Sequence, residues 1–439
     1  MAVTARARQT VRWGLRHLIA RRMIRRAARA GSTDALLMNE TALTANPFPY
    51  YESLRRQGRL VDSGLTLAAT AHDLCTAVLR SQDFGVVGGP NERVPAPVRW
   101  VVAFGGRGPI GTIEPPSMLA ANPPDHTRYR RNVSRAFTAR AVQALRTRTE
   151  HIAAELLDGM AARTGPTDLV AEYAALLPVT VISEMLGAPL SMREQFLEWG
   201  SGGALLLDPG LRYAQFRRSE DAMQAFHTWM VGHLAHLRRE PGDNILSALV
   251  NGQPAEGGLT EDELCSIAIL LLGAGFETTV NLLGSGAILL TSHPEQLERL
   301  RADPSLWPNA VEEILRFESP VQRTGRSALR DTVVAGERVA AGRMVSLLIG
   351  AANRDPAVFT EPQTFDIARA NADQHLAFSS GIHYCLGAGL AKMEGEVGLR
   401  ALFDRFPDLT PSGSPRRRTT KILRGYDAIP ARLTATVDA

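Results

Sequence analysis

Apolar residues recur every three or four positions over most of the chain, a spacing that predicts amphipathic helices. The helix that begins near Thr260 has the clearest start, because Thr260 and Glu263 have the spacing of a capping box. Ser292 is the expected N-cap of the next helix, with Pro294 in its first turn. The other predicted helices cover residues 125–163, 168–186, 191–206, 211–239, 308–318 and 387–405, and the helix from Thr260 extends to 291.

A few segments have the alternation of β-strands instead. Residues 59–70 predict a short strand region, residues 326–350 predict a β-hairpin, and weak strands are expected near the C-terminus. Residues 85–124 are rich in Gly and Pro and predict a long loop, which is usually functional inside a compact domain. Residues 355–384 have neither helical nor strand periodicity of apolar residues, which predicts an irregular segment. The pattern predicts a mainly α protein with a small β region, forming a single large domain over residues 36–439.

Residues 1–35 form a basic N-terminal extension of different composition. The first 33 residues contain nine Arg and no acid, which exceeds the net charge of +4 of the whole chain. The extension has no clean apolar region and cleavage site of a secretory signal. Its apolar residues do not gather on one helical face, so we expect a solvated or loosely docked segment; weak contact of residues 1–30 with a membrane surface is the alternative. These apolar residues are Val11, Trp13, Leu15, Leu18, Ile19, Met23 and Ile24.

Composition excludes several classes of protein. Of the 439 residues, 45% are hydrophobic and 21% charged, as in ordinary globular proteins, and no apolar run reaches the roughly 18–20 residues needed to cross a bilayer. No basic stripe with interleaved aromatic residues predicts nucleic-acid binding. The segment GRGPIG at 106–111 fits GxGxxG, but Pro109 lies inside it and no helix follows, so it does not predict a dinucleotide site.

The three cysteines lie far apart and form no CxxC pair, which fits a reducing, cytoplasmic location. Cys75 and Cys265 lie in apolar helical patterns and are expected to be buried. Cys385 differs, because it lies in the loop HLAFSSGIHYCLGAG, just before a predicted helix. Its thiolate could bind a metal: zinc would need three or four ligands, whereas haem iron needs one proximal ligand from the protein. The alternative is an inert cysteine in a turn.

The loop has further features that suit a thiolate beneath a flat macrocycle. Gly381 and Gly387 allow close approach of the backbone, and the N-terminus of the following helix would stabilise negative sulfur. The segment from Phe378 to Gly387 resembles the haem-binding signature of the cytochrome P-450 family, F-G-x-G-x-[HR]-x-C-x-G. Ser379 stands where that family most often has Gly, which leaves the local loop geometry open. The resemblance implies a cytochrome P-450 fold in which Cys385 ligates the iron of haem b.

Three more stretches match the same family in order and spacing. The first is ExxR, Glu313 to Arg316, which the resemblance implies is a buried ion pair that Arg354 of ANRDP would complete. Without the resemblance, ExxR would be an exposed pair contributing little stability. The second is the run from Ala274 to Thr279, which resembles the oxygen-activation motif of the family.

In that motif each residue has an implied role. Gly275 would let the helix widen beside O2, Thr278 would hold a proton there, and Glu277 would relay protons from solvent. The third stretch, NPPDHTRYRR, places His126 and Arg130 four residues apart on one helical face. The resemblance implies that the haem propionates bind to these two residues and to Arg326, His375 and His383.

The resemblance implies a soluble, bacterial-type haem-thiolate monooxygenase. It would insert one oxygen atom of O2 into a lipophilic substrate, with NAD(P)H electrons from a ferredoxin-type donor and its reductase. The donor would dock near Arg128, Arg131 and Lys392, and a monomer is expected.

Two alternative functions remain, a peroxide-driven peroxygenase and a non-catalytic haem or ligand binder. Neither would need Glu277 and Thr278. The expected substrate pocket comprises residues 85–120, including Trp100 and Phe104, with 191–215, 270–274 and 320–324.

Overall fold

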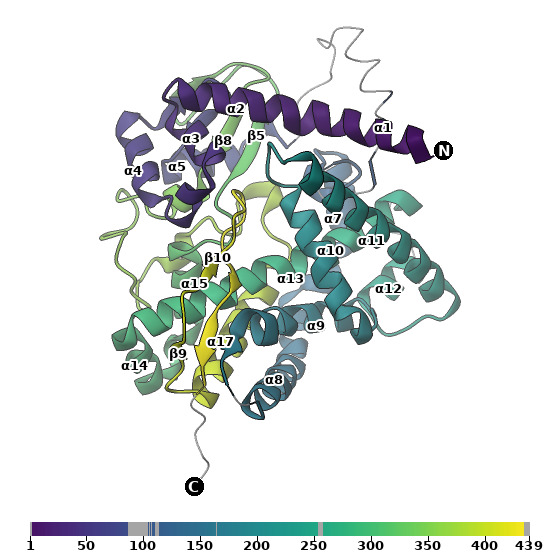
Figure 1. The fold of residues 1–439 in the computed structure, drawn as a ribbon, viewed down its shortest axis with the longest axis vertical. Helices are drawn as coiled ribbons and strands as arrows, with labels where there is room; N and C mark the ends of the chain where they lie inside the picture. The colour runs from purple at the N-terminus through teal and green to yellow at the C-terminus, as the bar shows by residue number, and fades with distance from the viewer. Residues whose placement is uncertain are drawn as a thin grey trace.

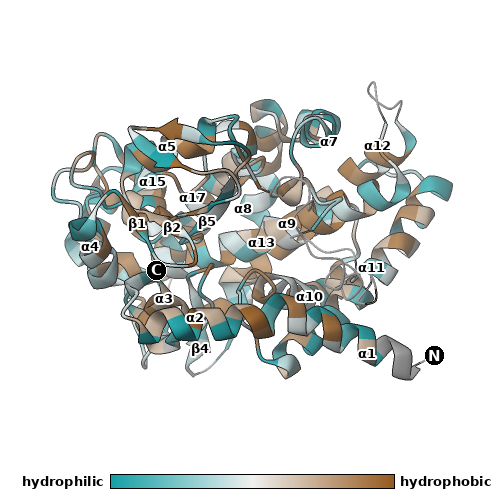
Figure 2. Ribbon diagram, turned by 90° about the horizontal axis from the view of Figure 1, so that it is seen from above, coloured by the Kyte–Doolittle hydropathy of each residue, from teal (hydrophilic) through white to brown (hydrophobic). Residues whose placement is uncertain are grey.

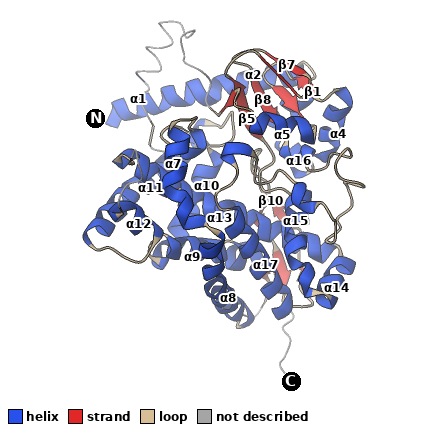
Figure 3. Cartoon of the chain, turned by 180° about the vertical axis from the view of Figure 1, so that it is seen from behind, coloured by secondary structure: helices blue, strands red, loops and turns tan. Residues whose placement is uncertain are grey.

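The computed structural model describes residues 2–86, 104, 106, 108, 109, 114–163, 165–252 and 258–433, with the side chains of residues 2–5 and 41 left aside. Helices form most of this part of the chain (Figures 1 and 3). They are α1 (Ala2–Trp13), α2 (Ile19–Arg29), α3 (Thr33–Asn39), α4 (Phe48–Gln57), α5 (His72–Arg80), α7 (Asp125–Val133), α8 (Ala139–Ala161), α9 (Leu176–Met185), α10 (Arg193–Leu205), α11 (Tyr213–Arg239), α12 (Ile245–Asn251), α13 (Glu261–Ser292), α14 (Pro294–Ala302), α15 (Trp307–Phe317), α16 (Ile349–Ala352) and α17 (Ala388–Arg405).

The strands are short and lie mostly on one side of the molecule, beside α4 and α5 (Figure 3). The largest sheet has the order β1-β2-β8-β5-β3, and its β2–β8 pair is parallel while the other pairs are antiparallel. A β6–β7 hairpin and two small C-terminal sheets complete the β structure. The strands are β1 (Leu60–Asp62), β2 (Leu67–Ala69), β3 (Phe84–Gly85), β4 (Thr167–Asp168), β5 (Thr324–Ala328), β6 (Thr332–Val334), β7 (Glu337–Val339), β8 (Met344–Leu347), β9 (Thr410–Pro411), β10 (Arg416–Arg417), β11 (Tyr426–Ala428) and β12 (Pro430–Arg432).

These elements confirm the predicted mainly α fold with a small β region, and they correct several boundaries. The predicted helix 125–163 is two helices, α7 and α8, joined by a short 3-10 turn. His293, not Ser292, is the N-cap of α14, because α13 continues through Ser292. Helix α12 was not predicted. Most of the predicted loop 85–124, including Trp100 and part of the GRGPIG segment, lies outside the described residues.

Helix α13 is the central element of the fold. Thr260 caps it, and both hydrogen bonds of the predicted capping box with Glu263 are present. Among the described helices, α13 alone is long and apolar enough to cross a membrane, but 78% of its most apolar window is buried inside the protein. It therefore has the surroundings of a core helix, with α9, α10, α11, α15 and α17 packed against it. Cys265 is buried on this helix, as predicted, and so is Cys75 on α5.

The N-terminal extension is not loosely docked, which corrects the expectation from sequence. Helices α1 and α2, joined by a π-helical turn, form one rod across the protein (Figure 1). Arg12 pairs with Glu220 at 2.7 Å, and the Trp13 indole donates to the carbonyl oxygen of Leu211 at 2.9 Å. The apolar residues of the extension form two faces instead of one, because Trp13 and Ile24 face the protein while Ile19 and Met23 are exposed.

A buried charge network connects α15 to the segment that precedes the cysteine loop. Glu313 and Arg316 are fully buried and form two parallel hydrogen bonds at 2.6 and 2.8 Å. Arg316 also donates to the carbonyl oxygens of Asn353, Pro362 and Thr364, so it fixes three points of an otherwise irregular segment. The burial and these bonds fit the role that ExxR was predicted to have.

The third member of the network is Arg369, not Arg354. The Nε of Arg369 lies 3.2 Å from both carboxylate oxygens of Glu313. Arg354 instead lies between two aromatic rings, 3.4 Å from the Phe48 centroid and 3.8 Å from the Phe317 centroid. It donates to the Phe317 carbonyl oxygen and packs in an apolar setting that lowers its pKa to about 9. Arg354 therefore stabilises the same region without contacting Glu313.

The chain offers a matched test of this network, because a second ExxR, Glu298 to Arg301, lies exposed on α14. Glu313→Ala would leave two arginines buried without their acid, which typically costs about 3–5 kcal/mol. Glu298→Ala would cost about 0.5 kcal/mol or less. We expect Glu313→Ala to give little haem-loaded protein and Glu298→Ala to give a normal yield, measured as the ratio of haem absorbance to protein. Equal yields from the two variants would contradict this role of Glu313.

Candidate functional site

A cavity of about 510 Å³ lies beside α13, and it brings together residues that are far apart in sequence. The cysteine loop and the start of α17 form one part of the lining, and α13 forms another. Helices α7 and α10 and strand β5 contribute the remaining sides. Cys385, Thr278 and Arg326 all line this one space.

Cys385 is held at the cavity wall by its own loop. Its backbone N–H donates to the Phe378 carbonyl oxygen at 2.9 Å, and α17 begins three residues later. Cys385 is exposed to the cavity. The surrounding protein nevertheless desolvates its thiol and raises the pKa, while the Gly387 N–H and the charge of Arg130 act in the opposite direction. A bound metal cation reverses the effect of burial, because it deprotonates a coordinating thiol. The loop therefore provides a thiol that a metal would convert into a thiolate ligand.

The glycines of the loop have different functions. Gly381 has φ of +69°, and a Cβ there would lie 2.4 Å from the Leu79 carbonyl oxygen, so this glycine permits packing against α5. A Cβ on Gly387 would meet nothing within 4 Å, so the space beside this residue is open. Ser379 has φ of +64°, a left-handed conformation that favours glycine. This conformation explains why the family signature most often has Gly at the position of Ser379.

One side of the cavity carries basic groups that have no acidic partner among the described residues. His126 and Arg130 of α7 lie there, as their spacing predicted, with Arg326 of β5 and His383 of the loop. Arg326 is 6% exposed and donates only to neighbouring oxygens of Thr324 and Gly325, and burial lowers its pKa to about 10. The Nε2 atom of His383 is buried without a hydrogen-bond partner. Such groups are costly to bury alone, so this wall suits an anionic ligand.

His375 does not belong to this wall, which corrects its predicted role. Its Nε2 atom lies 3.0 Å from the Glu312 carboxylate, and its Nδ1 atom accepts from the Ala377 N–H. Both ring nitrogens are therefore used within the protein. Phe378, three residues later, does line the cavity, as predicted.

The α13 wall contains the predicted Ala274, Gly275, Glu277 and Thr278. The Thr278 hydroxyl donates to the Ala274 carbonyl oxygen at 3.1 Å. The expected widening of the helix is absent, since α13 is α-helical throughout Glu261–Ser292. A Cβ on Gly275 would lie 3.0 Å from Ile182, so this glycine allows α13 to pack closely on α9.

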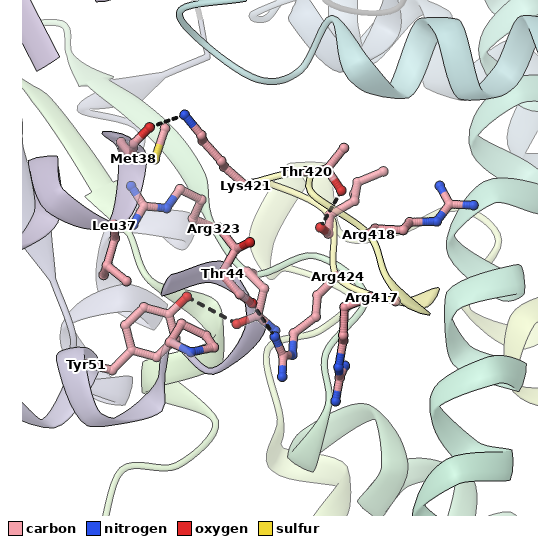
Figure 4. Close-up of a pocket in the computed structure, with 14 residues that line it drawn as sticks. Leu37, Met38, Thr44, Tyr51, Arg323, Arg417, Arg418, Thr420, Lys421 and Arg424 are labelled. Carbon is pink, nitrogen blue, oxygen red and sulfur yellow. Dashed lines mark hydrogen bonds between the residues drawn. The ribbon is translucent and has the colours of Figure 1, made fainter. Parts of the chain in front are cut away.

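Glu277 is an ion-pair partner and not a free acid. It is 4% exposed, and its carboxylate pairs with Arg418 from the C-terminal hairpin. Arg418 belongs to a group of basic side chains that surrounds a smaller cavity (Figure 4). In this group Arg323 pairs with Asp34 at 2.9 Å and Arg424 with Glu318 at 2.5 Å, so the acids nearby neutralise much of its charge. Any proton relay through Glu277 therefore involves Arg418, a residue that the motif did not indicate.

Sequence reasoning also missed Glu394 of α17. It lines the same cavity, is 1% exposed, and has one carboxylate oxygen without a hydrogen-bond partner. Burial raises its pKa well above the usual value, while a hydrogen bond from Thr279 opposes this effect. The surroundings of Glu394 therefore favour its protonated form. The available signal was an acid between Met393 and Val397 on the apolar face of a predicted helix.

The remaining lining is apolar. On α10 it consists of Trp199 beside the small residues Gly200, Gly203 and Ala204, and on α11 it includes Phe226. The rings of Trp199 and Phe226 stack with centroids 5.2 Å apart. The predicted segments 191–215, 270–274 and 320–324 all contribute to the lining. Phe104, also predicted to line the pocket, is 49% exposed.

Comparisons with known proteins agree with this geometry. The family model described as Cytochrome P450 matches residues 205–425. A Mycobacterium tuberculosis protein classed as cytochrome P450 140 is 47% identical over 426 residues, with 96% of this chain and 97% of the relative covered. The chain belongs to the cytochrome P450 family. The 6-deoxyerythronolide B hydroxylase of Saccharopolyspora erythraea is 44% identical over 324 residues, with 72% of this chain and 78% of the relative covered.

Solved P450 structures have the same fold. P450BioI, in complex with an acyl carrier protein ligated to hexadec-9Z-enoic acid, has a TM-score of 0.80 and 31% identity, with 89% of this chain and 99% of that one covered. Ligand-free CYP164A2 of Mycobacterium smegmatis has a TM-score of 0.80 and 33% identity, with 91% and 99% covered. The protein is thus a cytochrome P450 monooxygenase, and members of this family bind haem b through a cysteine thiolate.

The cavity fits haem b on its own chemistry. The group carries two carboxylates, and Arg326 and His383, which have no acidic partner among the described residues, lie on one wall with Arg130. Its iron needs a thiolate, and Cys385 lines the cavity beside the open space at Gly387. These residues are therefore the candidates that would hold the group.

Arg128 was predicted to lie at a partner surface, but most of its donors are used within the protein. It donates to both carboxylate oxygens of Glu263, at 2.5 and 2.9 Å, and Tyr129 donates to the same acid at 2.8 Å. The Arg128 hydrogen bonds lower the pKa of Glu263 to about 2, although burial opposes this shift. The pair fixes α7, which carries His126 and Arg130, to the start of α13.

This pair makes stability depend on acid pH in a defined direction. The pKa of Glu263 is about 2 in the folded protein and 4.5 ordinarily, so its contribution is complete above pH 4.5 and is lost as the pH falls toward 2. Arg128→Ala should lower the free energy of unfolding at neutral pH by about 2–3 kcal/mol and flatten its decline in that range. Denaturant titrations at a series of pH values measure both effects. Arg131→Ala, which removes an exposed arginine of the same helix, is the control and should change neither.

Proposed function

We propose that Cys385 is the haem ligand of a monooxygenase that oxidises a lipophilic substrate with O2. The observation that carries this proposal is the placement of Cys385, the unpartnered basic wall and the Glu277–Thr278 pair around one cavity. Haem, when bound, supplies the reduction and cleavage of O2. The protein's own groups would then bind its carboxylates at Arg130 and Arg326 and move protons along the α13 wall.

Thr278 and Glu277 are the proposed proton-handling groups. The Thr278 hydroxyl is anchored on Ala274 and lines the cavity, so it can hold a water or proton there. Release of Glu277 from Arg418 would connect it to solvent. A peroxide-driven peroxygenase or a non-catalytic binder would have no use for this pair, and the presence of both residues in the cavity lining supports the O2-dependent reaction.

The substrate is proposed to be a mid-sized lipophilic molecule, such as a polyketide, fatty acid, steroid or terpenoid. Trp199, Phe226 and the small residues of α10 give the cavity an apolar wall with room beside it. The names of similar proteins support this class: one is a 6-deoxyerythronolide B hydroxylase, and another was solved with myristic acid.

We propose that electrons from NAD(P)H arrive through a ferredoxin-type protein and its reductase. Arg131 on α7 is exposed, and Ile382 and Tyr384 of the cysteine loop are 50% and 43% exposed. An acidic carrier protein could contact these residues on the outer side of the loop that holds Cys385. Lys392 pairs with Glu312 at 2.9 Å and contributes less free charge than predicted.

The first test is the visible spectrum of the purified protein. Wild-type protein should show a thiolate-type haem spectrum, and its Soret band should shift toward high spin with one member of a panel of lipophilic compounds. Cys385→Ser should lose the thiolate-type spectrum, because a hydroxyl does not replace the thiolate as the iron ligand. Cys265→Ala, which changes a cysteine buried on α13, is the control and should keep it. An unchanged spectrum in Cys385→Ser would refute the ligand assignment.

The second test concerns proton delivery. Thr278→Ala should still consume NAD(P)H and O2, but product per O2 should fall by roughly tenfold and peroxide should rise, since a positioned proton-transfer group contributes about 10²–10⁴-fold. Thr291→Ala is a matched control, because Thr291 also donates to the carbonyl four residues earlier on α13 but lies outside the cavity lining. Unchanged coupling in Thr278→Ala would remove Thr278 from the mechanism.

A further inference from the structure

The N-terminal rod presents a surface that the proposed chemistry does not use. Its inner side is fixed by Arg12, Trp13 and the buried His17, whose Nδ1 atom accepts from the Leu211 N–H. Because these contacts order the helix in the protein alone, its outer side is formed before any partner binds. No folding cost would therefore oppose docking on this side.

The outer side of α2 combines arginines with exposed apolar residues. Ile19 and Met23, one turn apart, are 49% and 50% exposed. Around them lie exposed arginines, and no ion pair joins these to an acid within the described part of the chain. We call this surface the α2 outer face; it consists of Ile19, Arg22, Met23, Arg25, Arg26 and Arg29. Figure 2 shows the resulting mixture of hydrophilic and hydrophobic positions along α2.

The charge carried by the rod itself is of one sign. The first 33 residues contain no Asp or Glu, and the start of α11, which contacts α1, adds the exposed Arg217 and Arg218. Helices that bind at bilayer surfaces combine basic residues with apolar side chains that enter the headgroup region. A basic cluster is attracted to anionic headgroups, and each arginine near such a surface strengthens binding about fivefold.

The rod also lies over a segment that connects to the cavity. Trp13 and His17 contact Leu211 in the connection between α10 and α11, and Leu207 of the same connection lines the cavity. Asp208 fixes the other side of the connection by accepting from the N–H groups of Lys421 and Ile422. A surface bound at α2 would thus lie near the segment that closes the cavity.

We propose that the α2 outer face docks this protein on an anionic lipid bilayer. Exposed Ile19 and Met23 would enter the headgroup region, and the four arginines of the face would bind lipid phosphates. An exposed apolar pair among four arginines is the combination found in helices that lie in a bilayer surface. A lipophilic substrate dissolved in that bilayer would then be close to the α10–α11 connection. The docking itself does not depend on the chemistry at Cys385.

Sedimentation of the full-length holoprotein with vesicles tests the proposal. We expect binding to vesicles of equimolar phosphatidylglycerol and phosphatidylcholine, little binding to pure phosphatidylcholine, and weakening of the former by salt. The variant R22Q/R25Q/R26Q/R29Q should bind on the order of 600-fold more weakly, about fivefold for each arginine removed. The variant I19S/M23S, which keeps the charge, should bind several-fold more weakly.

The control removes the same charge elsewhere. R140Q/R239Q/R338Q/R416Q changes four other exposed arginines and should bind as wild type. The haem spectrum of every variant checks that the fold and the site are intact, and that result is independent of vesicle binding. No binding of the wild type to anionic vesicles, or equal weakening by the two quadruple variants, would overturn the proposal.

Discussion

The carboxylate of Glu313 lies where water does not reach, and its burial is tolerable only because two guanidinium groups share it. Arg316 and Arg369 satisfy that carboxylate and extend their remaining donors to backbone carbonyl oxygens between residues 353 and 364. A buried charge left without its partner is expensive, so the three residues hold their positions together. The irregular segment that leads to Cys385 has little secondary structure of its own, and this network gives it a fixed path.

The functional cavity differs from this network, because basic groups beside it have no acidic partner. Around Glu313 every charge has a partner, whereas the buried Arg326 and the half-buried His383 lie beside the cavity without an acid among the described residues. Buried groups of this kind identify where an anionic ligand would bind. The two acids of the cavity also differ, because Glu277 is paired with Arg418 while Glu394 has no cationic partner and burial raises its pKa. Burial and partners, not residue type, distinguish the two carboxyl groups.

The N-terminal helix shows how one segment can have two apolar faces. Trp13 and Ile24 pack on the protein, while Ile19 and Met23 lie on the other side with the arginines. These residues do not gather on one face of the helix, because the rod has one apolar face toward the protein and another toward solvent; a π-helical turn at Gly14–Leu18 also interrupts its α-helical periodicity. The ordered inner face is what makes the outer face available for a partner.

The sequence by itself determined the helical fold, the capping of α13 and the residue types at the cysteine loop, because periodicity and short motifs act over a few neighbouring positions. It also placed His126 and Arg130 on one face. Only the tertiary structure decided which distant groups meet: Arg369 with Glu313, Arg418 with Glu277, and His375 with Glu312 instead of the cavity. These partners come from loops and a hairpin without periodicity, and burial selects them through the cost of leaving a charge alone.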